Sequence, residues 1–259
     1  MPSVPAPPAV LAVVAHPDDE ALLAGGTLAM HAAAGAQVAV VTATWAPDSH
    51  RAEELAEALD ILGAGGPRML GHADHRVPRS APGRARLCDA PLDEVVEGIV
   101  RHIREVRPAV VLTHDPYGQV TGHPDHRLTN RATLLAVAAA GLEHLYPDAG
   151  TPWQPGAVHM ATHPHSALAD LGPLLRRVGK STLSVPDELV DLTRDVSPWA
   201  ARKWAAIAAH RSEAARERPL PGVLGRLPED VRHRIIATEY FMVSARATTG
   251  TAGATVSGA

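Results

Sequence analysis

The chain has 259 residues, carries a formal net charge of −4 at pH 7 and contains one cysteine, Cys88. A single cysteine excludes an intrachain disulfide and a zinc site built from several thiolates. The small net charge, the lack of a basic block and an aromatic share of 3% argue against nucleic-acid binding. A chain of this length can form one large domain.

The two ends of the chain differ in composition from the rest. Residues 1–8 are rich in proline and alanine and lack the basic segment of a signal peptide, so we expect a flexible N-terminus. Residues 247–259 are rich in glycine, threonine and alanine, and we expect a disordered tail. Residues 9–246 form the predicted domain. Since no apolar run reaches about 18 residues, we expect no membrane span and a cytoplasmic protein.

The first predicted element is a strand over residues 9–14, a short apolar run rich in β-branched residues. It leads directly into Ala15-His16-Pro17-Asp18-Asp19-Glu20. Pro17 cannot continue a strand ladder, so a turn begins there, and one of the two aspartates can cap a helix that runs to residue 34. One imidazole and two carboxylates at a strand end suit a divalent cation. The alternative is an Asp-rich helix cap with a chance histidine.

The next elements alternate between strand and helix. We expect strands over residues 37–42, 68–70 and 109–113, and helices over residues 51–62 and 92–105. The segment 74–89 has no apolar period, so we expect a loop that overhangs the site. It contains four arginines, which favour a phosphate or carboxylate on the substrate: Arg76, Arg79, Arg84 and Arg86.

The second motif follows the predicted strand 109–113 and a loop over residues 114–122. His123-Pro124-Asp125-His126 opens a helix that continues to about residue 140. His123 and His126 are three residues apart, so they share one helix face. Because both motifs follow predicted parallel strands, they should meet at the sheet edge where open α/β sheets bind ligands. The two motifs together therefore predict a metal site at this edge.

The C-terminal third contains a predicted strand over residues 157–162, an extended segment over 183–195 and a helix over 198–216. Lys203 and His210 are seven residues apart and share one face of that helix, which is either solvated or supports the site. Alternating strands and helices imply right-handed crossovers and a mainly parallel sheet. We therefore predict a single-domain, Rossmann-like, three-layer α/β/α fold.

The two motifs, His16-Pro-Asp-Asp-Glu and His123-Pro-Asp-His, resemble those of the zinc-dependent N-acetylglucosaminide deacetylases, the family called PIG-L or LmbE-like. Residues 51–55 and 203–212 resemble weaker segments of the family, and the resemblance spans roughly residues 10–241. It implies an LmbE-like fold. It also implies a zinc-dependent hydrolase that removes an acetyl group from an N-acetylglucosamine-like amino sugar or glycoconjugate by attack of zinc-bound water.

The resemblance also implies roles for individual residues. The implied metal ligands are His16, Asp19 and His126. The implied catalytic residues are Asp18 as general base, His123 as donor to the oxyanion and Asp125 as the group that orients an imidazole. The candidate substrate contacts are Arg51, Asp74, His114, Thr121 and His210; Thr121 stands where some family members carry a tyrosine. Zn²⁺ is the expected cofactor, and Fe²⁺ or another divalent ion stays open because His/Asp sites accept several metals.

Each role has a simpler alternative. Asp18 could be only a helix cap, and Asp125 an ordinary acid in a first helical turn. Glu20 is expected to be a first-turn helix charge rather than a catalytic group. Arg51 and Asp74 could be surface residues.

Two other functions stay open. The first is an amidase that acts on a thiol-sugar conjugate or another secondary metabolite. The second is a non-catalytic nucleotide- or ligand-binding α/β module, which is disfavoured because no Gly-x-Gly-x-x-Gly follows a strand. A small amino sugar or glycoconjugate is the expected partner, whereas nucleic acid and membrane are not. A homo-oligomer stays open.

Overall fold

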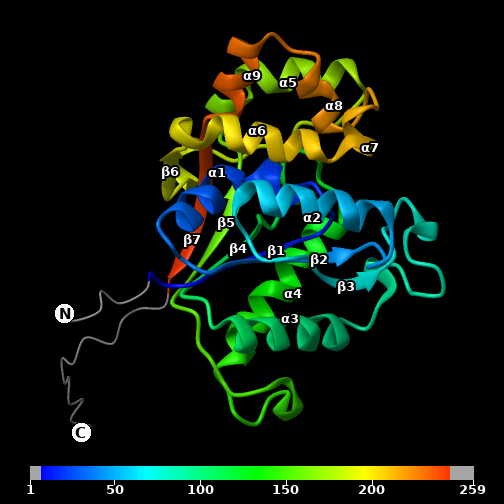
Figure 1. Ribbon diagram of the computed structural model, residues 1–259, viewed down its shortest axis with the longest axis vertical. Helices are drawn as coiled ribbons and strands as arrows, with labels where there is room; N and C mark the ends of the chain where they lie inside the picture. The colour runs from blue at the N-terminus through cyan, green and yellow to red at the C-terminus, as the bar shows by residue number, and fades with distance from the viewer. Residues whose placement is uncertain (1–6, 246–259) are drawn as a thin grey trace, which may run out of the picture.

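The computed structural model describes residues 7–245, so the predictions for residues 1–6 and 246–259 lie outside the described residues. One sheet runs through the molecule, with strand order β3-β2-β1-β4-β5-β7-β6 (Figure 1). Its strands are β1 (Val10–Val14), β2 (Val38–Thr44), β3 (Arg68–His72), β4 (Val110–His114), β5 (Ala157–Thr162), β6 (Leu192–Asp195) and β7 (Thr238–Ala245).

The sheet is mainly parallel, as predicted. Strands β3, β2, β1, β4 and β5 run parallel to their neighbours. Strand β7 pairs antiparallel with β5, and β6 pairs antiparallel with β7. The sequence pattern did not predict β7, which joins the edge of the sheet from the C-terminal end of the described chain.

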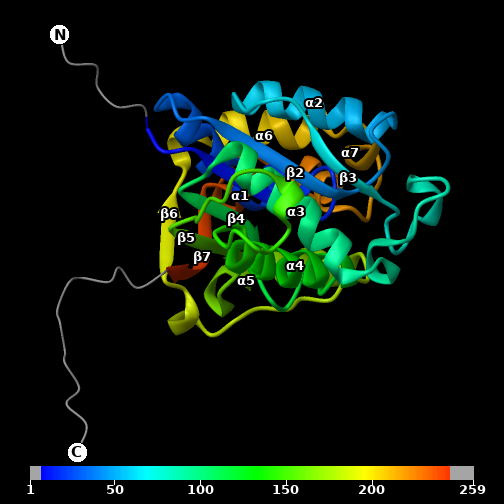
Figure 2. The same ribbon diagram turned by 90° about the horizontal axis from the view of Figure 1, so that it is seen from below.

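Helices cover both faces of the sheet, which confirms the predicted three-layer fold (Figures 1 and 2). Helices α1, α2 and α6 lie on one face, whereas α3 and α4 lie on the other. The helices are α1 (Asp19–Ala33), α2 (His50–Leu62), α3 (Leu92–Val106), α4 (Pro124–Ala140), α5 (Leu168–Arg177), α6 (Ala200–Ala209), α7 (Arg211–Ala214), α8 (Leu220–Gly225) and α9 (Glu229–Ile236).

Strand β1 lies at the centre of the molecule, and all five of its residues are buried. Val10, Ala12 and Val14 pack into the core beneath α1, α2 and α6. Leu11 and Val13 point to the opposite face and pack into the core beneath α3 and α4. A strand covered on both faces needs a continuous apolar run rather than alternation, which explains the pattern that predicted it.

The predicted helix over residues 198–216 is interrupted in the structure. Helix α6 ends at Ala209, and His210 has φ −76° and ψ 64°, outside the helical region, before α7 begins at Arg211. The break turns the chain towards α1, where the His210 side chain is fully buried. Helices α5, α8 and α9 were not predicted; they form a layer above α6 (Figure 1). Among residues 7–245, no helix is both long and apolar enough to cross a bilayer.

The strand order places a switch point between β1 and β4. From β1 the chain moves outward to β2 and β3 and then returns to the other side of β1 to form β4. The crossovers therefore leave β1 and β4 in opposite directions, which opens a crevice at their carboxyl ends. Both sequence motifs lie at this crevice.

Candidate metal centre and its cavity

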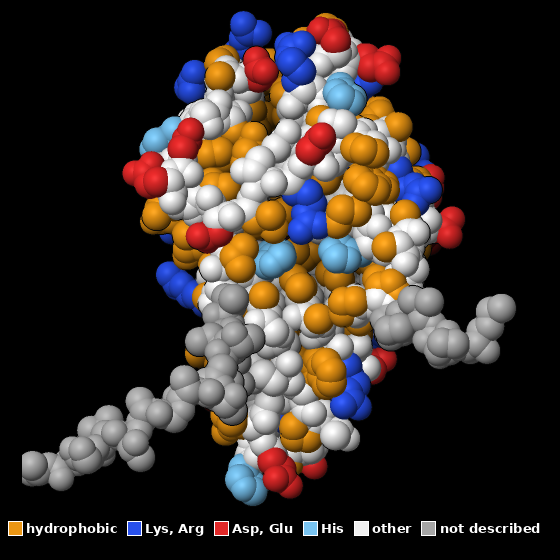
Figure 3. All heavy atoms as spheres, turned by 90° about the vertical axis from the view of Figure 1, so that its left-hand side faces the viewer, with side chains coloured by type: hydrophobic (Ala, Val, Ile, Leu, Met, Phe, Trp, Pro, Cys, Tyr) orange, Lys and Arg blue, Asp and Glu red, His pale blue; other side chains and the backbone are white. Residues whose placement is uncertain are grey.

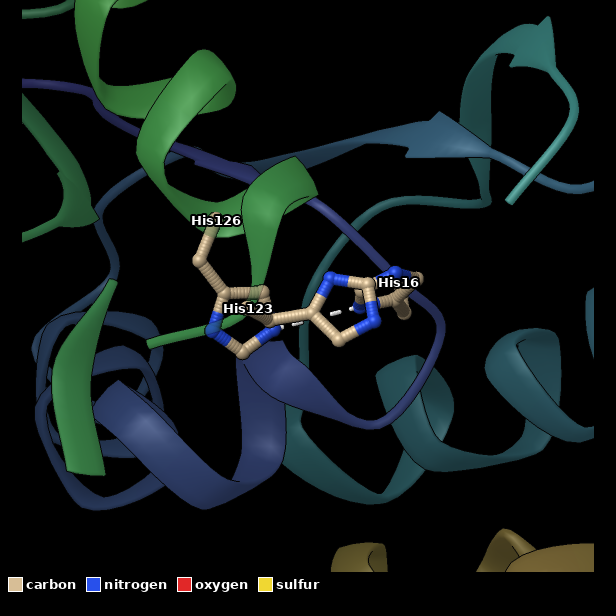
Figure 4. Close-up of side chains that lie close together, drawn as sticks. All are labelled: His16, His123 and His126. Atoms are coloured by element: carbon tan, nitrogen blue, oxygen red, sulfur yellow. Dashed lines mark hydrogen bonds between the residues drawn. The ribbon is translucent and has the colours of Figure 1, made fainter. Parts of the chain in front are cut away.

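Three segments bring the predicted metal ligands together. His16 lies in the loop after β1, Asp19 is the first residue of α1, and His126 lies in the first turn of α4. Figure 4 shows His16 and His126 beside His123, between the start of α4 and the loop after β1. All three rings are at most partly exposed.

The donor atoms of the predicted ligands form a nearly equilateral triangle. His16 Nδ1 lies 3.1 Å from Asp19 Oδ2, and His126 Nε2 lies 3.2 Å from His16 Nδ1. His126 Nε2 is 3.4 Å from Asp19 Oδ2. Ligand atoms about 2.0–2.2 Å from a tetrahedral zinc ion lie roughly 3.3–3.6 Å from one another. The triangle therefore has the size that one small divalent cation requires.

The outer nitrogens of both imidazoles are held by acceptors. His126 Nδ1 lies 3.2 Å from the carbonyl oxygen of Gly118, which can only accept a hydrogen bond. His16 Nε2 lies 3.2 Å from Asp125 Oδ2. The Gly118 carbonyl places the proton of His126 on Nδ1 and leaves a lone pair on Nε2, whereas both ring nitrogens of His16 face a carboxylate. His126 Nε2, His16 Nδ1 and a carboxylate oxygen thus converge in an arrangement that fits a metal cation.

His114 lies beside this triangle, but both of its ring nitrogens already have hydrogen-bond partners within the protein. Its Nε2 accepts a hydrogen bond of 2.9 Å from the Ala15 backbone N–H, and its Nδ1 lies 2.8 Å from Gln119 Oε1. Burial lowers the pKa of His114, so the ring stays neutral. Because both nitrogens are engaged and the side chain is 0% exposed, His114 has no free surface for the substrate contact that we expected.

Asp18 lines the cavity with a strained backbone, since its φ is 120°. Its side chain makes no capping hydrogen bond to α1, so the reading of Asp18 as a simple helix cap is wrong. Asp18 Oδ1 instead lies 3.4 Å from Arg51 Nη2. Burial raises the pKa of Asp18 to about 7, which outweighs the opposing charge of Arg51. A carboxyl group with such a pKa can exchange a proton near neutral pH.

Glu20 lies in the first turn of α1, as expected, and its side chain is buried there, with 0% exposure. Its Oε2 accepts a hydrogen bond of 3.0 Å from the Asp18 backbone N–H. Its Oε1 lies 2.7 Å from His210 Nε2. We expected His210 to bind the substrate, but it does not line the cavity. It instead supports the Asp18 turn through Glu20.

His123 lines the cavity at the N-terminus of α4. Its Nδ1 accepts a hydrogen bond of 3.2 Å from the Asp125 backbone N–H, so the proton of the neutral ring lies on Nε2. Burial lowers the pKa of His123 to about 3, and the charges of His16 and Arg76 add to this effect. His123 is therefore a neutral hydrogen-bond donor at physiological pH.

Asp125 is fully buried behind His16 and does not line the cavity. Besides His16, its Oδ2 accepts a hydrogen bond of 2.9 Å from the His75 backbone N–H. Its Oδ1 accepts a hydrogen bond of 3.0 Å from the Cys88 thiol, whose pKa burial raises to about 12. No sequence pattern pointed to these two partners, which come from the segment between β3 and α3. This network fixes the orientation of the His16 ring.

The triangle opens into a cavity of about 1220 Å³. Arg51, Asp74 and Thr121 line this cavity, whereas His114 and His210 do not. Arg51 is only 4% exposed, because its guanidinium contacts Asp18, Glu213 and the carbonyl oxygen of Pro17. Arg51 thus lies at the cavity wall, but its guanidinium group already contacts other groups of the protein.

Several lining residues were missed by the sequence analysis, among them His163, Lys180, Glu213 and Arg218. They come from the C-terminal half, where the sequence pattern predicted few elements. Lys180 stands out only as one of two lysines in the chain. His163 directly follows β5, whereas the positions of Lys180, Glu213 and Arg218 depend on how α5, α7 and α8 pack above the sheet.

Comparisons with known proteins agree with this geometry. The profile of the family PIG-L, described as GlcNAc-PI de-N-acetylase, matches residues 11–137, which include both motifs. The 1D-myo-inositol 2-acetamido-2-deoxy-alpha-D-glucopyranoside deacetylase of Rhodococcus jostii is 36% identical, over 90% of each chain. The deacetylase of the same name from Mycolicibacterium smegmatis is also 36% identical, over 80% of each chain.

A solved structure supports the fold. The conserved protein TT1542 from Thermus thermophilus superposes with a TM-score of 0.63 and 23% sequence identity. The superposition covers 96% of this chain and 100% of that one. The similarity therefore extends over the whole sheet and the helices that cover it.

Proposed function

This chain belongs to the PIG-L family, and from that premise we propose that its cavity removes the acetyl group from an N-acetylglucosamine-like amino sugar or glycoconjugate. One observation carries the proposal: two imidazole nitrogens and one carboxylate oxygen converge within 3.4 Å of one another at the cavity wall, next to a buried carboxyl group with a pKa of about 7. The named relatives deacetylate a 2-acetamido-2-deoxyglucopyranoside of inositol. A small-molecule sugar amide is thus the substrate class that both findings support.

A divalent metal belongs to this proposal, and we propose Zn²⁺ as the ion. His16, Asp19 and His126 would hold it, since two imidazoles and one carboxylate are a common zinc ligand set. Fe²⁺ stays an alternative because the same donors accept other divalent ions. When bound, the metal acts as a Lewis acid that acidifies water and polarises an amide carbonyl.

The protein's own side chains then move the protons. Asp18 accepts a proton from the attacking water, whose oxygen forms a bond to the acetyl carbon. His123 Nε2–H donates a hydrogen bond to the oxygen on which negative charge develops. The C–N bond then breaks, and Asp18 returns its proton to the leaving nitrogen. The products are acetate and the free amino sugar, which balances the addition of one water molecule.

The sugar would be held by polar groups at the cavity wall. Asp74 Oδ2 lies 3.4 Å from His16 Nε2, so a hydroxyl bound by Asp74 would lie close to the metal ligands. Thr121 offers a hydroxyl that can both donate and accept. Arg51 contributes mainly by holding Asp18, because its guanidinium already contacts Asp18 and Glu213. The named relatives favour neither the thiol-sugar amidase nor the non-catalytic module.

A matched pair of substrates tests the proposal. Metal-loaded protein is incubated with methyl N-acetylglucosaminide and with N-acetylcyclohexylamine, and the release of free amine is measured. A site that hydrogen-bonds sugar hydroxyls should prefer the sugar by a large factor, because the analogue leaves those polar groups unpaired. Comparable kcat/KM values for the two compounds would leave only a general amidase. Asp18→Asn serves as the inactive control.

A further inference from the structure

We propose that Trp45 is a specificity-determining residue, because its indole ring provides an apolar surface against which one face of the sugar ring packs. This inference rests on the proposed deacetylase function and extends it to a residue that recognises the sugar. A pyranose ring carries hydroxyl groups along its edge and C–H groups on its faces. The hydroxyls need polar partners such as Asp74 and Thr121, whereas the C–H faces need an apolar surface.

Trp45 lies beside the first sequence motif. It directly follows β2 and lines the cavity. The preceding residue, Thr44, donates hydrogen bonds of 3.0 and 2.7 Å from its backbone N–H and its hydroxyl to the carbonyl oxygen of Ala15. Ala15 immediately precedes His16, one of the predicted metal ligands. Trp45 therefore belongs to the wall of the cavity next to the loop that carries His16.

The backbone of Trp45 is strained, since its φ is 73°. A positive φ is unfavourable for a residue with a bulky side chain. The Trp45 N–H donates a hydrogen bond of 2.9 Å to the carbonyl oxygen of His72, and the Ala46 N–H donates one of 3.0 Å to that of Ser80. These bonds hold the strained turn in place.

Strain of this kind gathers at the cavity. Five residues other than glycine have a positive φ in the part of the chain that the structure describes, and three of them line the cavity: Asp18, Trp45 and Gln119. Strained residues concentrate at functional sites, because elsewhere nothing compensates for their cost. The conformation of Trp45 therefore points to a role within the cavity.

The indole ring offers the cavity carbon rather than a hydrogen-bond donor. Trp45 as a whole is partly exposed. Its Nε1, however, is buried and has no hydrogen-bond partner among residues 7–245. Any surface that the side chain presents to the cavity is therefore apolar, which suits C–H groups and not hydroxyls.

The ring is also fixed before a substrate binds. Arg51 Cζ lies 5.0 Å from the centroid of the Trp45 ring, within the range of a cation–π contact. The His50 ring meets the indole edge-on, with centroids 5.5 Å apart and planes at 86°. Arg51 is itself held by Asp18 and Glu213 at 3.4 and 2.8 Å. A ring that is already ordered loses little conformational entropy on binding.

The same contacts relate Trp45 to the proposed base. The indole ring and the Asp18 carboxylate both contact the Arg51 guanidinium. A sugar whose acetamido group reaches Asp18 therefore has Trp45 beside its ring. A second role is conceivable for the indole, namely to hold Arg51 and through it Asp18, and the two roles differ in their kinetic effect.

Exposed apolar side chains are common and need no function of their own. Figure 3 shows many of them on the side of the molecule that faces left in Figure 1, where they are mixed with acidic and basic groups. Trp45 differs because it lies in a cavity of about 1220 Å³, beside polar residues such as Asp48 and Ser49. Aromatic rings next to a few polar groups are typical of small-molecule sites.

Steady-state kinetics of Trp45→Ala with methyl N-acetylglucosaminide tests the proposal. The sugar ring does not react, so its contact with Trp45 is equal in the ground state and the transition state. KM should therefore rise about 3–10-fold, while kcat stays within about 2-fold of the wild-type value. Trp45→Phe keeps an aromatic ring and should recover most of the affinity. N-acetylethanolamine, an amide without a sugar ring, should give equal kcat/KM values for Trp45→Ala and the wild type.

Trp153→Ala is the matched control. Arg107 Cζ lies 4.6 Å from the centroid of the Trp153 ring, which is the same kind of contact, but Trp153 does not line the cavity. Its KM should equal that of the wild type. A Trp45→Ala variant with a lower kcat and an unchanged KM would overturn the sugar contact and assign Trp45 to holding Arg51. Wild-type values of both constants would also overturn it.

A fluorescence titration separates this proposal from the function on which it rests. Binding of methyl N-acetylglucosaminide to the metal-loaded wild-type protein should change the tryptophan emission, because the sugar replaces water at the indole ring. Trp45→Phe should lose this change, and Trp153→Phe should keep it. This outcome would support the sugar contact even if no substrate were deacetylated. No change in the wild type, or a change that persists in Trp45→Phe, would overturn it.

Discussion

At the scale of single residues, the turn at Asp18 carries both strain and proton chemistry. A non-glycine residue with φ of 120° is unfavourable unless its surroundings hold it there. Glu20 accepts a hydrogen bond from the Asp18 backbone N–H, and Arg51 lies beside the Asp18 carboxylate. The strained turn thereby places the carboxyl group at the wall of the cavity that the predicted metal ligands also line.

We expect Asp18→Asn to keep the metal but to lose activity by about 10²–10⁴-fold, because the amide cannot accept the proton of the attacking water. The measurements are kcat and the metal content by elemental analysis. Full activity in this variant would show that the base lies elsewhere. Loss of the metal would instead assign Asp18 to the ligand set.

His123 and His126 are predicted to differ although they share a helix turn. His123→Ala should retain the metal and lose about 10²–10³-fold in kcat, because it removes one donor to the oxyanion. His126→Ala should lose the metal, since its Nε2 completes the triangle with His16 and Asp19. Elemental analysis of both variants beside the wild type checks the assignment. The reverse pattern of metal loss would exchange the two roles.

His210 should make stability depend on pH. Burial lowers its pKa, but the carboxylate of Glu20 outweighs burial, so the pKa in the folded protein is raised above the ordinary 6.5. The folded state then binds the proton more tightly than the unfolded state. The stabilisation is fully present below about pH 6.5 and is lost as pH rises through the folded pKa.

The Tm difference between the wild type and His210→Gln checks this expectation. The difference should be largest near pH 6 and should shrink towards pH 9. His144→Gln, a histidine outside the cavity lining and the Glu20 contact, is the control and should give a Tm difference with little pH dependence. A His210→Gln difference that grows with pH would contradict the assigned ion pair.

At the scale of elements, helix α1 is held at a break near its start. Ala24 has φ −141° and ψ 15°, which are not helical values. The helix restarts after it, and the first backbone N–H groups of the new segment have no partner within the helix. Glu239 of β7 accepts hydrogen bonds from the Gly26 and Thr27 backbone N–H groups at 2.8 and 3.0 Å. Lys203 of α6 lies 2.7 Å from Glu239. Strand β7 and helix α6 therefore fix the helix whose first residue is Asp19.

Lys203→Met should destabilise the protein by about 3–5 kcal/mol, because it leaves Glu239 as a buried charge without its partner. The alternative that Lys203 lies on a solvated helix face is contradicted by its 2% exposure. Urea unfolding of the metal-loaded protein measures the free energy of unfolding. The double variant Lys203→Met/Glu239→Gln should recover part of the loss. A single variant as stable as the wild type would show that the pair contributes little.

At the scale of the whole molecule, the predicted metal connects parts that are far apart in the sequence. His16 lies in the loop after β1 and Asp19 begins α1 on one face of the sheet, whereas His126 belongs to α4 on the opposite face. A metal bound by all three therefore joins the two helical layers across the sheet. Binding to the folded state alone stabilises it by mass action.

Chelation should lower the Tm, and metal at about 1,000 times its Kd should restore roughly 4 kcal/mol of stability. Thermal unfolding before and after dialysis against a chelator measures the shift. His126→Ala is the control and should show no such response. An equal response in that variant would place the stabilising metal at another site.

The layered fold and the location of the site could be predicted from local sequence patterns. Strand β1 was predicted because a strand buried on both faces needs a continuous apolar run, and α3 because Val95, Ile99 and Ile103 repeat with the helical period. The two motifs follow β1 and β4, whose carboxyl ends meet at the switch point. These features depend on local periodicity, which neighbouring residues encode.

The roles of individual side chains, in contrast, depend on contacts that form when the chain folds. Glu20 and His210 are 190 positions apart, so no local pattern distinguishes a buried pair from two solvated charges. His114 and His126 both lie near Asp19, yet the Ala15 N–H occupies the Nε2 of His114, whereas Nε2 of His126 is free to bind a metal. Strand β7 and the C-terminal residues that line the cavity likewise depend on contacts between distant segments. Burial and hydrogen-bond partners set charge and orientation, and both are fixed only when the chain has folded.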